Sequence, residues 1–581
     1  MKPKSEHIYE FGDFRLDAAN HLLLREGRPV ALKPKAFDTL LLLIENRGRV
    51  LEKNELMETL WADTFVEEAN LTQNVYELRK ALGESPREPR FIENVPKRGY
   101  RFVGEVKEQV TERADATETG RGAEIKSLAV LPFKPLMANE RDEFLEIGIA
   151  DTLITGLSGI GQIIVRPTGA IRKYSDPSQD PLAAGLELKV DAVLDGSIQR
   201  YENRLRVNVR LLRVKDGTTL WAGKFDENFT DIFTLQDSIS EKTAAALSLK
   251  LTNEARLRLT KRYTDNTEVH QLFLKCRYHW HKWTPENWRK SIEYGSRAIT
   301  LDSSHAPSYS WTGASYCTLG IFGVVPPTEA FAKAKQLVEK ALSLDPTLSE
   351  AHEVSGAIKL FYEWDWETVG KTLRRAIELN PSNALARDLY ALYLAADGQA
   401  AAVSEVKLAL EVDPLSLLIN TDVGYILYYA RRYAEAAEQL QKTLELDPYF
   451  AHARFALGLV RLQEKRFNEA VAETKKAVSF SRREAASSPE LGYAYAVVGQ
   501  NGEARKILAE LKKHSESEYV DPYHIALIHI GLTDKNRAFE WLHRALKNRS
   551  RELIYLKSNP VCDPLRSDPR FIDILRRIGF A

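Results

Sequence analysis

The stretch ANLTQNVYELRKALG, residues 69–83, sets an apolar stripe against a polar face and decides the fold of the N-terminal region. Successive residues of an α-helix turn by about 100° around its axis. Four apolar side chains therefore share one side of the predicted helix: Leu71, Val75, Leu78 and Leu82. Away from this stripe point Gln73, Tyr76, Glu77 and Lys80, with Thr72 and Arg79 at its flanks. Gly83 is a typical helix stop.

The segment FIENVPKRGYRFV, residues 91–103, predicts a β-hairpin. Pro96 and Gly99 frame its turn, which places Lys97 and Arg98 at the tip. Seven basic and three acidic residues lie between positions 79 and 101, a local net charge of +4. The whole chain is balanced, with 81 basic and 81 acidic residues, so this local excess is the pattern expected where duplex DNA binds.

Two further helices are predicted upstream. ALKPKAFDTLLLLIENRGRVL, residues 31–51, puts Phe37, Leu40, Leu41 and Ile44 on one apolar helical face. EKNELMETLW, residues 52–61, predicts a second and shorter helix.

Four motifs follow one another in this region: LKPKAFDTLLLL, GRVLEKNELMETLW, NLTQNVYELRKALG and VPKRGYRF. In this order they resemble the OmpR/PhoB-type winged helix, in the variant found in CadC- and ToxR-like regulators, over about residues 8–104. The resemblance implies that the helix at 69–82 enters the major groove of DNA and that the hairpin reaches an adjacent minor groove. It implies these DNA contacts: Thr72, Gln73, Tyr76, Arg79, Lys80, Lys97 and Arg98.

The resemblance also has limits. The sequence shows no phosphoacceptor receiver domain ahead of the motifs, as response regulators have, and no membrane segment after them, as CadC- and ToxR-like proteins have. Neither phosphorylation nor membrane sensing is therefore carried over. In the resembling family the loop equivalent to Trp61–Glu68 touches RNA polymerase, which makes the polymerase a further expected partner.

A charged, Thr-rich segment at residues 107–124 predicts a linker, because it has too little apolar surface to fold alone. Residues 125–252 then mix strand and helix patterns and predict an α/β domain. LAVLPF, GIADTLITGLS, VDAVLDGSIQR and TLWAGKFDENFTDIFTLQDSIS resemble the TolB-like amino-terminal domain, which implies scaffolding or signal coupling. Asp151, Asp191 and Asp195 are predicted to be turn, cap or surface residues, because no catalytic partner motif accompanies them.

Residues 265–581 are helical and repetitive. Asp345-Pro346, Asn380-Pro381, Asp413-Pro414 and Asp447-Pro448 recur at spacings of 35, 33 and 34 residues. This period, with its small, aromatic and Pro positions, resembles the tetratricopeptide (TPR) repeat. We expect seven or eight helix pairs in a solenoid with an extended concave surface, in which glycines let paired helices approach closely.

Several classes of function are not indicated. Cys276, Cys317 and Cys562 are the only cysteines and form no CxxC pair, which favours a reducing cytoplasm. No apolar run suggests a signal peptide or a membrane span. His279 and His281 lack a third ligand nearby, so we assign them to aromatic packing rather than to a metal, and we expect no cofactor. Nucleotide-binding, serine hydrolase and zinc-protease motifs do not occur, so an enzyme is not expected.

The sequence therefore predicts a multidomain protein with a winged helix (α+β, residues 6–106), a linker (107–124), an α/β domain (125–252) and an all-α TPR solenoid (265–581). The predicted function is sequence-specific binding of double-stranded DNA in transcription regulation, in the cytoplasm. The later domains would bind a protein partner or relay a signal, with a dimer on DNA as one possible assembly. The alternative is a TPR interaction scaffold that its winged helix localises to DNA.

Overall fold

The computed structural model divides the chain into two compact units, one of residues 1–124 with 212–220 and one of residues 125–211 with 221–581. The structure describes residues 6–17, 22–25, 28–30, 32, 34–60, 68–85, 89–96, 98–111, 125–135, 143–176, 178–201, 204–228, 232–249, 252–259, 261–481 and 488–580.

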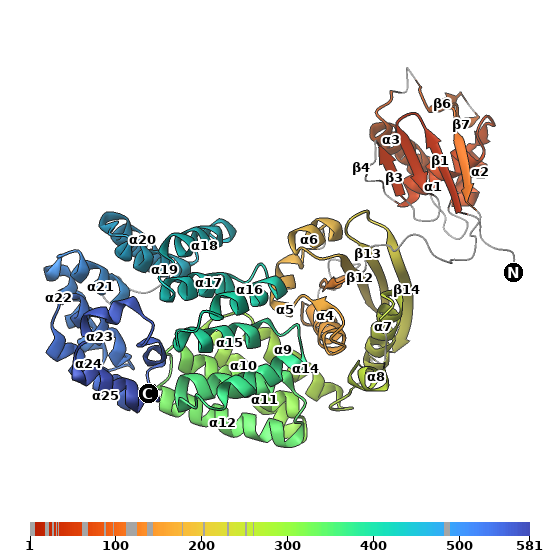
Figure 1. Cartoon of the computed structure of the whole chain (residues 1–581). Coiled ribbons are helices and arrows are strands. Elements are labelled where there is room, and N and C mark those ends of the chain that lie inside the picture. The colour runs from red at the N-terminus through yellow and green to blue at the C-terminus, as the bar shows by residue number, and fades with distance from the viewer. Residues whose placement is uncertain are drawn as a thin grey trace. The chain divides into compact units, whose positions relative to one another are not determined.

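The N-terminal domain has two antiparallel sheets and three helices (Figure 1). The five-stranded sheet has the order β4-β3-β2-β1-β8. Its strands are β1 (Glu6–Phe11), β2 (Phe14–Asp17), β3 (Leu22–Arg25), β4 (Arg28–Pro29) and β8 (Lys107–Thr111). The smaller sheet has the order β5-β7-β6. It comprises β5 (Leu51–Glu52), β6 (Ile92–Val95) and β7 (Gly99–Phe102), and the helices are α1 (Pro34–Glu45), α2 (Lys53–Leu60) and α3 (Glu68–Leu82).

The predicted start of the linker is wrong. Residues 107–111 form β8, which pairs antiparallel with β1 and places His7 opposite Val110. Backbone pairing of this kind gives a polar segment a place in a sheet that its own apolar content does not predict. The rest of the predicted linker, residues 112–124, lies outside the described residues.

One aromatic cluster ties the two sheets of this domain together. Phe11 of β1 lies 5.3 Å from Phe91, which precedes β6, and 5.3 Å from Phe102 of β7, measured between ring centroids. Both contacts are edge-to-face, an arrangement that aromatic rings favour. Because all three rings are buried, the hairpin is anchored to the N-terminal sheet through the core.

The middle domain is a six-stranded sheet with helices packed against it. Its order is β11-β9-β12-β13-β14, and β10 pairs with β12. The strands are β9 (Ser127–Val130), β10 (Lys134–Pro135), β11 (Ile164–Val165), β12 (Ala192–Tyr201), β13 (Arg204–Arg213) and β14 (Thr219–Asn228). The helices are α4 (Glu143–Ser158), α5 (Thr168–Ile171), η2 (Arg172–Tyr174), α6 (Pro181–Glu187), α7 (Ile232–Ala246) and α8 (Asn253–Leu259). This confirms the predicted mixture of strands and helices.

The three aspartates of this domain have structural partners, and two of them are not where the sequence suggested. Asp151 and Asp195 are buried in ion pairs, Asp151 with Arg277 at 2.9 Å and Asp195 with Arg210 at 2.7 Å. The prediction of turn, cap or surface positions is therefore wrong for these two, because each has a cation that only the folded chain supplies. Asp191 accepts hydrogen bonds from the backbone N–H groups at 126 and 127 and ties the start of β9.

Helical repeats form the rest of the chain. Along the described residues, the helices from α9 to α24 make eight consecutive pairs, followed by α25. The first four pairs comprise α9 (Thr267–Trp280), α10 (Pro285–Leu301), α11 (Ala306–Ile321), α12 (Pro327–Leu344), α13 (Ser349–Ile358) with the π-helical η4 (Lys359–Glu363), α14 (Val369–Leu379), α15 (Ala384–Ala396) and α16 (Ala402–Val412). The last four comprise α17 (Leu417–Tyr429), α18 (Tyr433–Leu446), α19 (Ala451–Gln463), α20 (Phe467–Phe480), α21 (Pro489–Val497), α22 (Asn501–His514), α23 (Pro522–Gly531) and α24 (Lys535–Lys547). After them come η6 (Arg551–Tyr555), η7 (Pro560–Leu565) and α25 (Pro569–Arg577).

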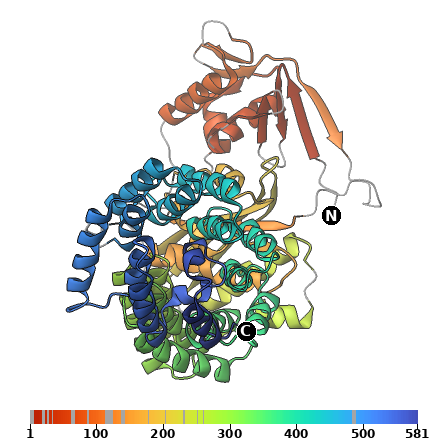
Figure 2. The same ribbon diagram turned by 60° about the vertical axis from the view of Figure 1, so that its left-hand side comes forward.

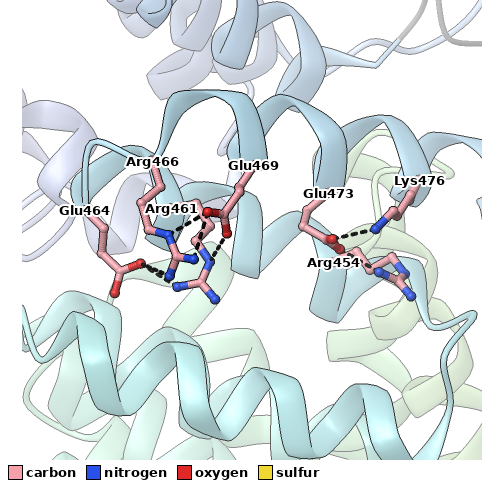
Figure 3. Close-up of polar contacts among 7 residues, drawn as sticks. All are labelled: Arg454, Arg461, Glu464, Arg466, Glu469, Glu473 and Lys476. Carbon is pink, nitrogen blue, oxygen red and sulfur yellow. Dashed lines mark hydrogen bonds and ion pairs between the residues drawn. The ribbon is translucent and has the colours of Figure 1, made fainter.

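The predicted repeat features are confirmed. Each of the four Asp-Pro or Asn-Pro pairs directly follows the second helix of a pair. A side-chain carbon built at Gly424 would lie 2.6 Å from Leu440, and one built at Gly458 would lie 2.5 Å from Thr474, so these glycines permit the close approach. Ion pairs add to this packing between α19 and α20 (Figure 3). Two of them join the helices, Arg461 to Glu469 and Arg454 to Glu473. The others lie along one helix or at its end: Arg461–Glu464, Arg466–Glu469 and Lys476–Glu473.

Two buried arginines join the middle domain to the repeats. Arg166, just after β11, donates to Glu411 O at 2.6 Å and Val412 O at 2.8 Å, at the end of α16. It also donates to Leu188 O and Lys189 O, at the end of α6. One guanidinium therefore meets the carbonyl ends of two helices, where a positive charge is stabilising. Arg277 of α9 also joins the two parts, through an ion pair with Asp151 of α4.

The C-terminal segment packs back onto earlier repeats. Arg431, after α17, forms a two-pronged ion pair with Asp563 of η7, both contacts at 2.7 Å. Trp366 Nε1 donates to Ile578 O at 2.6 Å, and Tyr429 stacks on Tyr555 at 4.8 Å. Figures 1 and 2 show the helix pairs following a curved path, consistent with these contacts between its distant parts. The interior of this curve is thus partly filled by the chain itself.

The aromatic assignment of the paired histidines is confirmed. His279 stacks on Tyr294 at 5.3 Å, and its Nδ1 lies 2.8 Å from Asn287 Oδ1. His281 lies 5.6 Å from the Trp311 ring. Within the described part of the chain, none of the helices has the length and apolar character that crossing a membrane requires.

We predict that Arg166→Ala lowers the free energy of unfolding of the larger unit by about 3 kcal/mol, because four backbone carbonyls lose a charged donor. Eight of the nine tryptophans lie after residue 124, so the urea unfolding curve of the full chain followed by tryptophan fluorescence reports on this unit. Arg204→Ala is the matched control, since that side chain is 70% exposed. Equal unfolding midpoints for the two variants would contradict the role given to Arg166.

Candidate nucleic-acid interface

Helix α3 has the two faces that its sequence predicts. Leu71, Val75, Leu78 and Leu82 are each at most 2% exposed. Thr72, Gln73 and Lys80 are exposed on the other side, and Tyr76 is 60% exposed. A large aromatic side chain so far out of the core has no packing reason to be there, which is typical of a contact surface.

Arg79 does not belong to the exposed face. It is 9% exposed, and its Nη2 donates to Ile92 O of β6 at 3.0 Å. Its Nε lies 4.0 Å from Glu84 Oε1. The prediction of Arg79 as a DNA contact is therefore corrected: its guanidinium is used to hold the hairpin against the end of α3.

Glu84 is a residue that sequence reasoning missed. Its carboxylate is 1% exposed and accepts backbone hydrogen bonds from Arg90 at 2.9 Å, Phe91 at 2.6 Å and Ile92 at 3.1 Å. These bonds fix the segment that enters β6, across a connection that has no periodic pattern. Glu84 and Arg79 together set the position of the hairpin relative to α3.

The turn of the hairpin depends on a glycine. A side-chain carbon at Gly99 would lie 1.9 Å from Leu51 O, so only glycine permits the pairing of β7 with β5. The Arg98 backbone N–H donates to Val95 O at 3.0 Å and closes the turn, while the Arg98 side chain is exposed. Lys97 lies outside the described residues. The predicted structural role of Gly99 is confirmed.

Among the described residues of the predicted set, two basic side chains are exposed: Lys80 at the end of α3 and Arg98 in the turn of the hairpin. Gln73 and Tyr76 lie on the exposed face of the same helix as Lys80, and Gln73 Nε2 lies 3.4 Å from Glu77 Oε1. A helix that offers amide, phenol and ammonium groups on one face has the chemistry to contact base edges and phosphates together.

Comparison with known proteins bears on this domain directly. Residues 27–102 match the family model described as "Transcriptional regulatory protein, C terminal". The N-terminal domain is an OmpR/PhoB-type DNA-binding domain. The chain is 31% identical over 97 residues to the transcriptional activator CadC of Escherichia coli, covering 16% of this chain and 19% of CadC.

The similarity to regulators extends beyond the OmpR/PhoB-type domain. Residues 124–242 match the model "HilA/YgeH-like transcriptional regulator, second domain". The transcriptional regulator HilA of Salmonella typhimurium is 25% identical over 432 residues, which is 74% of each chain. The TolB-like interpretation of the middle domain is not confirmed, because the model that matches there is a different one. A protein named putative adenylate cyclase 3, of Rhizobium meliloti, is 31% identical over 151 residues, 26% of each chain.

Two solved structures complete the comparison. The DNA-binding domain of E. coli CadC is 30% identical, with coverage of 18% of this chain and 98% of that one and a TM-score of 0.17. The APC/C hetero-tetramer Cut9–Hcn1 is 17% identical, with coverage of 59% and 64% and a TM-score of 0.36.

We predict that Glu84→Ala loosens the hairpin, because three backbone N–H groups and the Arg79 guanidinium lose their acceptor at once. The expected cost is about 3 kcal/mol. Amide hydrogen exchange of the full chain should show faster exchange in residues 89–102. Glu93→Ala is the control, because Glu93 is partly exposed and pairs with Arg101 at the surface of the hairpin. Unchanged exchange in Glu84→Ala would remove the basis for this anchoring role.

Proposed function

We propose that this chain regulates transcription by binding double-stranded DNA through α3 and the hairpin β6–β7, with Thr72, Gln73, Tyr76, Lys80, Lys97 and Arg98 as the contacts. The observation that carries the proposal is the polar face of α3, where Tyr76 is 60% exposed opposite a fully buried stripe. A face of this kind suits the major groove, which admits an α-helix and presents a distinct pattern of donors and acceptors for each base pair.

We propose that the two compact units have different functions. Residues 6–111 bind DNA, and the joined middle domain and repeats receive a signal that changes DNA occupancy. Arg166 and Arg277 support this second role, because their contacts hold the α/β domain and the helical repeats together as one unit. The names of the regulators HilA and CadC, which the chain resembles, agree with a role in transcription.

We also propose that the chain is not an enzyme. Asp151, Asp191 and Asp195, the carboxylates considered as catalytic candidates, all hold structural hydrogen bonds or ion pairs. The relative named putative adenylate cyclase 3 is matched over only 26% of its own length. Cyclase activity measured with ATP on the purified full chain tests this point, and turnover above that of a boiled control would contradict it.

We propose two further kinds of partner, RNA polymerase and a protein that binds the repeats. Residues 61–67 of the loop expected to touch RNA polymerase lie outside the described residues. A protein partner of the repeats would have to use a surface other than the parts of the interior that α4, α5 and the C-terminal segment already contact. The interaction scaffold is thereby less favoured than the regulator. Fractionation of the untagged protein tests the proposed location in the cytoplasm. The stoichiometry of the DNA complex tests whether the chain binds DNA as a dimer.

We predict that Lys80→Ala and Arg98→Ala weaken DNA binding by different routes. Loss of a phosphate contact at Lys80 should reduce affinity for all sequences and lower the salt slope by about one unit. Loss of Arg98 should lower discrimination among flanking A·T-rich sequences, because a guanidinium reads a narrow minor groove. Equilibrium binding of the full chain to a selected operator at several salt concentrations measures both effects. Arg15→Ala, exposed on β2, is the control; variants of Lys80 and Arg98 that bind like it would refute this docking.

We predict that Gln73→Ala and Tyr76→Ala act at particular base pairs only. Each should cost about 1–3 kcal/mol at one or two operator positions and little elsewhere, which is the signature of contact with a base edge. The measurement is binding of each variant to a set of operators with single base-pair changes. A uniform loss over the whole set would show that these side chains contact the backbone instead.

A further inference from the structure

A cavity of about 560 Å³ lies between the middle domain and the repeats, inside the larger unit. Helices α4 and α5 form one wall through Ile154, Thr155 and Thr168. The repeats form the rest, from α9 to the start of α19. Pockets that bind small molecules have volumes of roughly 300–1,000 Å³ and often form where two domains meet.

Aromatic rings cover the side of the cavity formed by the first repeats. Trp280, Trp283, Trp288, Trp311 and Phe322 all line it. The rings contact one another at centroid distances of 5.1 to 6.2 Å, which holds them as one rigid surface. A wall of indole faces binds a flat apolar body, and it also attracts a cation that lies against it.

Carboxyl groups mark the side formed by later repeats. Glu350 and Glu353 of α13 and Asp413 before α17 line the cavity. Burial raises the pKa of Glu353 to about 8, against a hydrogen bond with Asn383 that lowers it, and the pKa of Asp413 to about 6, against the nearby Arg166 charge that lowers it. Asp413 is 8% exposed, and its Oδ1 has no hydrogen-bond partner among the described residues.

The positive charge of the cavity wall is already used. The Arg277 guanidinium pairs with Asp151 at 2.9 Å and donates to Thr155 Oγ1 at 3.0 Å. Burial holds the pKa of His281 well below its usual range, so that ring is neutral. A carboxyl with a pKa of about 8 holds its proton at neutral pH, and an ammonium group in contact with Glu353 would favour the loss of that proton. The three carboxyls of the lining therefore favour a cationic ligand over an anionic one.

Two side-chain nitrogen atoms near the aromatic side also have no hydrogen-bond partner among the described residues. They are Trp288 Nε1, on a side chain that is 3% exposed, and His281 Nε2. Unpaired buried polar atoms of this kind cost free energy unless a bound molecule meets them. A hydrogen-bond acceptor on the apolar body of the ligand would satisfy the indole N–H.

We propose that this cavity binds an arylalkylamine, in which a protonated amine meets the carboxyl side and an aromatic ring with a hydrogen-bonding oxygen meets the tryptophan side. The ligand bridges the middle domain and the repeats, so binding strengthens the joint between them. The proposal does not depend on DNA binding, and its test contains no DNA.

Three probes that share one ring separate the contributions: tyramine, with an ammonium group, tyrosol, with a hydroxyl in its place, and 4-hydroxyphenylacetate, with a carboxylate. Isothermal titration of the full chain should give an affinity for tyramine about tenfold higher than that for tyrosol, as one charged hydrogen bond allows. The carboxylate should bind weakest of the three. Equal affinities, preference for the carboxylate, or no heat from tyramine up to about 5 mM would overturn the proposal.

Variants place the binding at this cavity. Glu353→Gln keeps the shape of the side chain and should abolish most of the preference for tyramine over tyrosol, while tyrosol binding reports that the cavity is intact. Asp413→Asn provides a second, independent variant with the same expectation. Glu378→Gln, exposed on α14, is the matched control and should bind all three probes like the original chain. A preference for tyramine that survives in both cavity variants would place the amine elsewhere and refute the assignment.

Discussion

The burial of two arginines between the middle domain and the repeats is the constraint on which the larger unit depends. A guanidinium carries five N–H donors and stays charged, so it must be surrounded by acceptors when it leaves water. Arg166 obtains four backbone carbonyls, and Arg277 obtains the Asp151 carboxylate and a hydroxyl. Neither set is complete in the middle domain or in the repeats alone, because the acceptors of Arg166 come from both parts and Arg277 and Asp151 lie on opposite sides.

Much of the fold could be predicted from the sequence because its signals are local. The 34-residue period fixed the helix pairs through the Pro positions that follow each second helix, and the stripe from Leu71 to Leu82 fixed the buried side of α3. The union of the two later domains could not be predicted in this way. Arg166 and Val412 are 246 residues apart, and no periodic pattern links an arginine in a loop to a carbonyl at a helix end.

In the candidate DNA interface, too, some positions follow from local sequence signals and others depend on tertiary contacts. Its exposed positions, Gln73, Tyr76 and Lys80, follow from the helical period alone. The helical period also predicts Arg79 near this face, because Arg79 lies at the flank of the stripe, where a rotation of the helix by a few degrees decides between solvent and core. The structure resolves this through Glu84 and Ile92, partners that a polar turn and a hairpin bring to the end of α3. For a side chain at the boundary of a helix face, tertiary contacts decide whether it is buried or exposed.

The interior of the repeats contains polar groups whose burial costs free energy, and packing alone does not explain why they are there. Carboxyls that burial makes harder to ionise, such as Glu353 and Asp413, and an indole N–H without an acceptor among the described residues, such as that of Trp288, destabilise a folded chain. Apolar residues would serve equally well if the only task were to join α4 and α5 to the helices. Glu353, Asp413 and Trp288 all line one cavity, at the joint between the middle domain and the repeats that Arg166 and Arg277 hold closed. A molecule that supplied the missing charge and acceptor would offset this cost only while the joint is closed, so its binding and the union of the two parts would be thermodynamically linked.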